Sequence, residues 1–200
     1  TFKFSYFRDF ISKKFGPNGD GFYAWNDLTY LLYEYEESLK ESRGQSRLSS
    51  WSNFIKNDGD KVSIEHIYPQ TATDQYWLER FSDFTNEQIR YLRGSLGNLL
   101  PLSQSINSSL QNDAFDVKKG LKLDGNGNVI RHGYADGSYS EQEVARVPEW
   151  TADEIKVRGL KLLGYMEKRW NINFGAEKNK LEILHLSFLN QDHVDEAKEA

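Results

Sequence analysis

A histidine beside a carboxylate is the first feature of this 200-residue sequence that could do chemistry. Glu65 and His66 stand in the segment Ile-Glu-His-Ile-Tyr-Pro-Gln, residues 64–70. An imidazole suits a general base at neutral pH, and a carboxylate is a hard oxygen ligand for Mg²⁺ or Mn²⁺. The pair predicts metal-assisted hydrolysis with His66 activating water. The alternative is structural, because a lone His on a strand face with Val62 and Ile64 is more often a hydrogen-bonded core residue.

Two asparagines in a second segment could complete such a site. Asn98 lies in Leu-Gly-Asn-Leu, residues 96–99, and Asn107 follows nine residues later. An amide oxygen is a neutral hard ligand, and magnesium usually takes only one or two protein ligands, so Glu65 and Asn107 would suffice. Both asparagines also have a structural interpretation, since Gly-Asn is turn chemistry and Asn is tolerated near the start of a helix.

Lys118 and Lys119, which follow Phe115, could hold the phosphate backbone of DNA. Paired lysines are also common on a solvated surface, so the pattern allows either interpretation. The remaining histidines have no ligand partners at metal spacing, and we expect them to be surface or packing residues: His132, His185 and His193.

Composition limits the classes of protein to consider. A chain with 38% hydrophobic and 14% aromatic residues can build a core, and the absence of cysteine excludes disulfides and thiolate zinc sites. No apolar run is long enough for a membrane span and no signal peptide is present, so we expect a cytoplasmic protein. The net charge of -5 argues against binding through a broad basic face. A first residue other than Met suggests a piece of a longer protein.

The elements around the first site are predicted from periodicity and turn signals. Residues 22–42 have apolar positions three and four apart, which predicts a helix, and a polar loop follows over residues 42–50. Asn-Asp-Gly-Asp at residues 57–60 is a turn signal. Residues 61–68 then alternate as a strand that Pro69 stops.

The second half of the chain predicts a strand, a helix and a hairpin. Short helices are expected within residues 71–94, then a strand over 96–102 and a helix that holds Asn107. Turn clusters make residues 123–139 a hairpin or an irregular loop. Two capping boxes, Ser140 with Glu143 and Thr151 with Glu154, predict helices, whereas residues 181–189 read as neither helix nor strand.

Taken together, these motifs resemble the core of HNH nucleases. The resemblance rests on Glu-His-Ile-x-Pro-Gln, then Leu-Gly-Asn-Leu, an Asn nine residues after the first Asn, and Phe-x-x-Lys-Lys. More narrowly, the chain is similar over residues 20–171 to the HNH domain at the C-terminus of GmrSD-type, modification-dependent restriction endonucleases. Two departures are that many HNH cores have Asp where this chain has Glu65, and His where it has Asn107.

The resemblance implies a fold, an activity and residue roles. The fold would be α+β, a mainly α-helical domain around a small ββα-metal core. Its parts would be a helical segment 1–60, the core 61–122, a hairpin or loop with helices 123–172, and an extension 173–200. His66 would be the base, Asn98 would order the site, and Glu65 and Asn107 would hold Mg²⁺ or Mn²⁺.

The implied activity is hydrolysis of DNA, either modified or unmodified, as part of restriction or anti-phage defence. The implied partner is an N-terminal ParB-like domain that uses a nucleoside triphosphate and is absent from these 200 residues. The alternative is a catalytically decayed HNH module that binds DNA or a protein. An RNA-directed nuclease of the same type is a further alternative.

Overall fold

The computed structural model describes residues 2–45 and 62–190, with the side chains of 103–105 excepted. The turn predicted at residues 57–60 lies outside these ranges. The described chain divides into two compact units, each discontinuous in sequence. Unit 1 comprises Thr1–Asn26, Phe81–Asn98 and Thr151–Ala200, and unit 2 comprises Asp27–Arg80 and Leu99–Trp150.

The centre of unit 2 is an antiparallel pair of strands followed by a helix. Strand β1 (Val62–His66) pairs with β2 (Leu99–Ser103), and α6 (Gln104–Leu110) follows directly. The order strand, strand, helix is the one that the sequence predicts. The strands are shorter than expected, because β1 ends at His66 ahead of Pro69 and residues Leu96–Asn98 form a 3₁₀ turn, η3, before β2.

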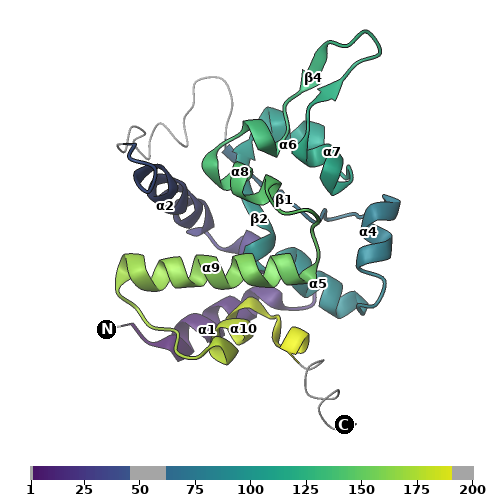
Figure 1. Cartoon of the computed structure of the whole chain (residues 1–200). Helices are drawn as coiled ribbons and strands as arrows, with labels where there is room; N and C mark the ends of the chain where they lie inside the picture. The colour runs from purple at the N-terminus through teal and green to yellow at the C-terminus, as the bar shows by residue number, and fades with distance from the viewer. Residues whose placement is uncertain (1, 46–61, 191–200) are drawn as a thin grey trace, which may run out of the picture. The chain divides into compact units, whose positions relative to one another are not determined.

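The other elements of unit 2 are one longer helix, several short ones and a hairpin. They are α2 (Leu28–Glu41), α4 (Gln75–Arg80), α7 (Phe115–Lys119), β3 (Lys122–Leu123), β4 (Val129–Arg131), the 3₁₀ turn η4 (Tyr134–Asp136) and α8 (Tyr139–Ala145). Strands β3 and β4 pair antiparallel, so of the two predicted alternatives the hairpin is the one that forms, and it extends away from α6 and α7 (Figure 1).

Helix α2 is joined to α8 by buried polar contacts. The Glu36 carboxylate accepts hydrogen bonds from the backbone N–H groups of Tyr139 (3.0 Å) and Ser140 (2.8 Å), at the positive N-terminal end of α8. The Tyr35 hydroxyl lies 3.0 Å from both oxygens of Glu143. The helix therefore buries acidic as well as apolar residues. It starts at Leu28 rather than near Phe22, since a 3₁₀ turn, η2 (Gly21–Ala24), precedes it.

Unit 1 is helical. It contains α1 (Phe4–Ser12), the 3₁₀ turn η1 (Lys13–Phe15), η2, α5 (Asn86–Gly94), η3, α9 (Ala152–Trp170), α10 (Glu177–Leu184) and the 3₁₀ turn η5 (Ser187–Asn190). Helix α10 packs against α9 and α1, and the three lie side by side (Figure 1). The segment from residue 181 that the sequence left undecided is thus helix followed by a 3₁₀ turn.

The capping predictions are half right. Thr151 and Glu154 form a capping box at the start of α9, as predicted. At α8 the capping box is formed by Ser138 and Glu141, two residues before the predicted pair, and Ser140 is instead buried in the first turn. The α+β, mainly helical class is confirmed. No helix in the described ranges is long and apolar enough to cross a membrane.

Close backbone packing holds η3 against α9 within unit 1. Any Cβ at Gly97 would overlap the carbonyl oxygen of Ile155 and the backbone nitrogen of Gly159. The guanidinium of Arg158 donates to the Gly97 carbonyl at 2.8 Å. Gly97 is therefore required by the approach of two backbones.

We expect Gly97→Ala to lower the free energy of unfolding by about 2 kcal/mol or more, because helix and turn must separate to admit the methyl group. The matched control is Gly164→Ala in α9, where a Cβ meets nothing within 4 Å. That substitution should be neutral or stabilise the chain by about 0.5–1 kcal/mol. Urea unfolding of both variants measures the difference, and equal effects would contradict the packing argument.

A second prediction concerns His185, which stacks on Phe15 with ring centroids 4.1 Å apart. Burial lowers the pKa of His185 from 6.5 to about 4, and the charge of Arg90 acts in the same direction. The unfolded chain therefore takes up this proton first, so stability is full above about pH 6.5 and falls as the pH drops toward 4, by up to about 3 kcal/mol.

The check is the free energy of unfolding at pH 7.5 and pH 5.0 for the wild type and His185→Asn. Asn does not titrate and tolerates the left-handed backbone of this position, where φ is 58°. The pH-dependent loss should be smaller in the variant. The same loss in both proteins would show that other groups cause it.

Candidate active site

Strand β1 places Glu65 and His66 at its end. In the β1–β2 register Glu65 faces Leu100 and His66 faces Leu99, both fully buried. Because side chains alternate along a strand, Ser63 and Glu65 share one face, and His66 belongs to the other until the strand ends. Glu65 and His66 are 5% and 7% exposed, so both lie close beneath the surface of unit 2.

Glu65 is held by two donors from elements far along the chain. Lys118 Nζ of α7 lies 2.6 Å from Glu65 Oε1, and the Tyr134 hydroxyl of η4 donates to the same oxygen at 3.2 Å. Among the described residues, both side-chain hydrogen bonds to this carboxylate end on Oε1. The backbone of His66 contributes a further hydrogen bond to this carboxylate.

Lys118 is fully buried, which a phosphate-binding lysine would not be. Besides Glu65 it donates to the carbonyl oxygens of His66 (3.2 Å) and Ile67 (3.1 Å), so all three of its N–H donors have acceptors. Phe115, one turn earlier on the same face of α7, is also buried and draws that face inward. In this arrangement Lys118 offers no surface to DNA, and it ties down the end of β1.

In this cluster, burial shifts the pKa of each charged group and ion pairing opposes that shift. Burial raises the pKa of Glu65, and the charge and hydrogen bond of Lys118 act against that rise. Burial lowers the pKa of Lys118, and the charge of Glu65 acts against that fall. Burial and Glu65 also keep the pKa of Tyr134 well above 10, so its phenol stays a donor. Each charge is tolerated at this buried position because the other lies within hydrogen-bond distance, and either charge alone would destabilise the fold.

Asn107 lies on the same side of the sheet as Glu65. Its side-chain N–H donates to the Ser63 hydroxyl at 2.8 Å, and Ser63 precedes Glu65 by two residues, about 7 Å along a strand. Asn107 is half-buried, and because its nitrogen is the donor, its oxygen stays an acceptor. A carboxylate oxygen and an amide oxygen on one side of a sheet suit a hard cation such as Mg²⁺ or Mn²⁺.

The ligand set for such a cation is sparse. Within the described ranges, no three His, Cys, Asp or Glu side chains come together to hold a metal. Glu65 is then the one charged ligand that the sequence proposes for the site. Waters and substrate oxygens would have to fill most of the coordination shell, which is usual for magnesium.

Asn98 belongs to unit 1 and the other predicted site residues belong to unit 2. Asn98 is fully buried; its side-chain N–H donates to the Arg93 carbonyl at 3.1 Å and its backbone N–H to the Ser95 carbonyl at 3.0 Å. These bonds fix the 3₁₀ turn η3 directly before β2, which begins at Leu99. The local structure of Gly97 and Asn98 is thus a turn, in agreement with the structural interpretation of this Gly-Asn pair.

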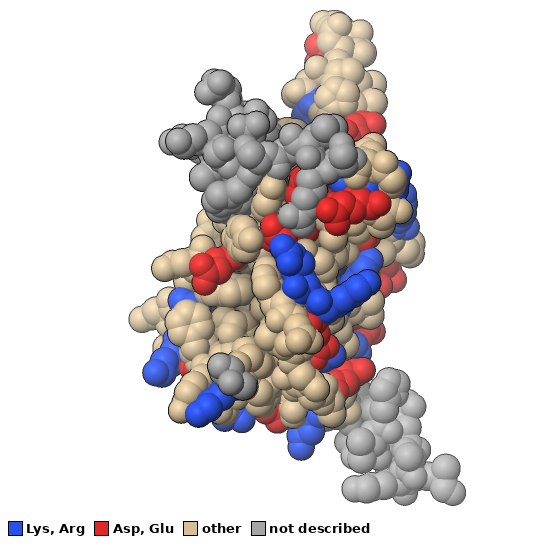
Figure 2. All heavy atoms as spheres, turned by 90° about the vertical axis from the view of Figure 1, so that its left-hand side faces the viewer, with Lys and Arg blue, Asp and Glu red and all other residues tan. Residues whose placement is uncertain are grey.

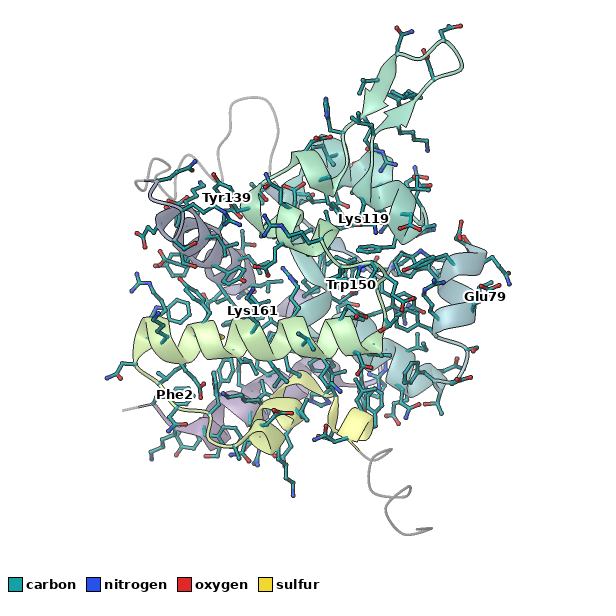
Figure 3. The ribbon with its side chains drawn as sticks, viewed as in Figure 1. Phe2, Glu79, Lys119, Tyr139, Trp150 and Lys161 are labelled. Carbon is teal, nitrogen blue, oxygen red and sulfur yellow. The ribbon has the colours of Figure 1, made fainter. Side chains whose placement is uncertain are left out.

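Lys119 is bound to the protein surface rather than extended. Its ammonium donates to the carbonyls of Val147 (3.3 Å) and Pro148 (3.0 Å) and pairs with Asp116 at 2.9 Å. Figure 3 shows it between α7 and the segment that carries Trp150. One-fifth of its side chain is exposed, so a phosphate could reach it only by replacing one of these acceptors.

Sequence reasoning did not find Tyr134 or Ser63, and it gave Lys118 an exposed role. The spacing of Phe115 and Lys118 carried a usable signal, because two positions three apart share a helix face. Tyr134 had no such signal. It is brought to Glu65 by the turn after the β3–β4 hairpin.

The comparison with family models identifies the protein family. Residues 5–164 match the model described as GmrSD restriction endonucleases, C-terminal domain. The chain belongs to this family. The matched range contains all six residues predicted for the site, and it makes the chain a domain of the nuclease part of a restriction system acting on DNA. Comparisons with curated proteins and with solved structures give no match.

For this GmrSD C-terminal domain, a double-mutant cycle on the buried pair tests its energetics. We expect Glu65→Gln and Lys118→Met each to lower the free energy of unfolding by about 3 kcal/mol, because each leaves a buried charge unpaired. The double variant should lose clearly less than the sum of the two.

Asp116→Asn, which breaks the exposed Lys119–Asp116 pair on the same helix, is the control and should leave stability nearly unchanged. Urea unfolding provides all four values. Strict additivity of the Glu65 and Lys118 effects would mean that the two groups do not stabilise each other.

Proposed function

We propose that this domain is an HNH-type, metal-dependent DNA endonuclease in which His66 is the general base. The observation that carries the proposal is the arrangement of residues at the end of β1. There His66 directly follows the buried Glu65 in sequence where the strand ends, and Asn107 is bonded to Ser63 on the Glu65 face. Membership in the restriction endonuclease family supplies the substrate class.

His66 would take the proton from the attacking water. A neutral imidazole near the operating pH is an efficient base, and it needs a fixed position to act. The Lys118 bonds to the carbonyls of His66 and Ile67 hold the backbone at this point. Asn98 would order the site from the segment before β2.

Glu65 and Asn107 would hold Mg²⁺ or Mn²⁺. Such a cation, when bound, neutralises charge that develops on the phosphate and on the leaving oxygen. Of the chain's own groups, Glu65 contributes a carboxylate oxygen whose orientation Lys118 and Tyr134 determine. Asn107 contributes a neutral oxygen.

DNA contact would come from Lys119 and from parts of the protein beyond this chain. The net charge is -5, and on the face drawn in Figure 2 Lys and Arg side chains lie among Asp and Glu rather than in a continuous basic surface. A ParB-like N-terminal domain that uses nucleotide would therefore deliver the DNA, modified or unmodified, to this domain. The reaction would take place in the cytoplasm. Lys118 has the positioning role that its burial supports, instead of phosphate contact.

A decayed module that binds DNA or protein is the second candidate. It is favoured by the ion pair itself, because the Lys118 ammonium already neutralises the one carboxylate of the proposed cation site. Thermal shift with Mn²⁺ in the presence of a short DNA duplex separates the two candidates. An active site should be stabilised by Mn²⁺ in the wild type and less in Glu65→Ala or Asn107→Ala, whereas a decayed site should show no difference.

The decisive experiment is cleavage of supercoiled plasmid, unmodified and modified, with Mg²⁺ or Mn²⁺. We expect nicking or linearisation that chelator abolishes and that His66→Ala reduces by about 100-fold or more. His132→Ala is the matched control, because that side chain is 62% exposed beside Asp136 and lies outside the site. Normal activity of His66→Ala would overturn the assignment of the base.

A further inference from the structure

The buried Lys118 makes the proposed cation site electrically neutral before any metal binds. Glu65 contributes one negative charge and Lys118 one positive charge at 2.6 Å, while Asn107, Ser63 and Tyr134 are neutral. A site built for tight magnesium binding without substrate would be expected to carry more negative charge.

The next charged groups along this cluster are also paired, with Asp113 between Arg131 and the more exposed Lys122. Arg131 of β4 is buried and its guanidinium pairs with Asp113 at 3.0 Å. Both act on Lys118 with opposite signs. The charges of Asp113 and Arg131 therefore oppose each other at Lys118.

Lys118 cannot turn aside when a cation arrives. Its ammonium is fixed by Glu65 and by the carbonyl oxygens of His66 and Ile67, and no part of its side chain is exposed. Turning away would break its hydrogen bonds to these three acceptors and would bury an unpaired ammonium. The positive charge thus stays close to the cation site throughout.

We propose that Lys118 is a positioning residue that fixes Glu65 for a divalent cation and also keeps that cation weakly bound until a phosphodiester supplies further negative charge. The inference rests on the proposed function, from which it takes Glu65 and Asn107 as ligands.

The physical reason is that a fixed ammonium repels a divalent cation most strongly where water is excluded. Magnesium sites that work on phosphates usually combine one or two carboxylates with substrate oxygens, so the missing charge comes with the DNA. Metal loading and DNA binding are then coupled, and each strengthens the other by the same factor. A domain without DNA would hold little metal.

The test is the affinity for Mn²⁺ alone, measured by calorimetry and by electron paramagnetic resonance at pH 8.0, where protonation of Glu65 competes least. We expect Lys118→Met to bind Mn²⁺ at least about tenfold more tightly than the wild type. Lys119→Met is the matched control: it makes the same change in net charge one residue away, and its affinity should stay within about twofold of the wild type.

A folded Lys118→Met chain with unchanged or weaker Mn²⁺ binding would overturn the inference, and so would an equal effect of Lys119→Met. If Lys118→Met does not fold, the His66→Ala chain carries the test, because it leaves the pair intact and DNA uncut. Its Mn²⁺ affinity should rise at least about tenfold when a short duplex is added. An unchanged affinity overturns the inference.

The two proposals fail in different assays. If the wild type cleaves plasmid in a metal-dependent way and also binds Mn²⁺ tightly without DNA, the role of Lys118 is rejected and the nuclease assignment stands. Absence of cleavage, with the tightening in Lys118→Met still present, would reject the nuclease activity of this chain and keep the role of Lys118.

Discussion

An ammonium group removed from water must find acceptors for all its protons, and Lys118 meets this requirement with one carboxylate and two carbonyls. The three acceptors belong to consecutive residues, Glu65, His66 and Ile67. Satisfying the lysine therefore shapes the end of β1, where the proposed metal ligand and the proposed base are consecutive residues. Helix α7 needs to be only five residues long to do this, because Phe115 anchors it in the core.

The contacts between α2 and α8 support this arrangement from a second direction. Glu36 accepts two backbone N–H groups at the start of α8, and the Ser138 capping box supplies another acceptor there. The 3₁₀ turn η4 packs against α8 and carries Tyr134, which donates to Glu65. Figure 3 shows Tyr139 at the start of α8, facing α2. Buried acids thus organise unit 2 around the site, although none of them is a proposed ligand except Glu65.

In unit 1 the constraint is steric rather than electrostatic. Gly97 allows η3 to touch the backbone of α9, and Arg158 secures the contact through the Gly97 carbonyl. Asn98 follows at once and is closed into the turn by its bonds to Arg93 and Ser95. The Leu-Gly-Asn-Leu segment is therefore a packing motif as well as a candidate functional one, and both uses require the same residues.

The sequence by itself determined which segments became helices and strands wherever the signal was local. Apolar spacing predicted α2, a capping box predicted the start of α9, alternation before Pro69 predicted β1, and turn residues indicated a hairpin or a loop where β3 and β4 lie. Motif spacing also led to the right restriction endonuclease family. Local signals were less exact at element boundaries. The cap of α8 lies at Ser138 and not at Ser140, whose backbone N–H donates to Glu36, a distant residue that the local sequence does not indicate.

Only the tertiary structure decided what surrounds each polar side chain. Lys118 and Lys119 are neighbours of the same type, yet one is fully buried on Glu65 and the other lies near the surface on Val147 and Pro148. The face of α7 that turns inward is chosen by packing against segments about fifty residues earlier and thirty later. Burial, and with it the energetic consequence of a charge, depends on those distant segments, so no local pattern could assign the two lysines their different roles.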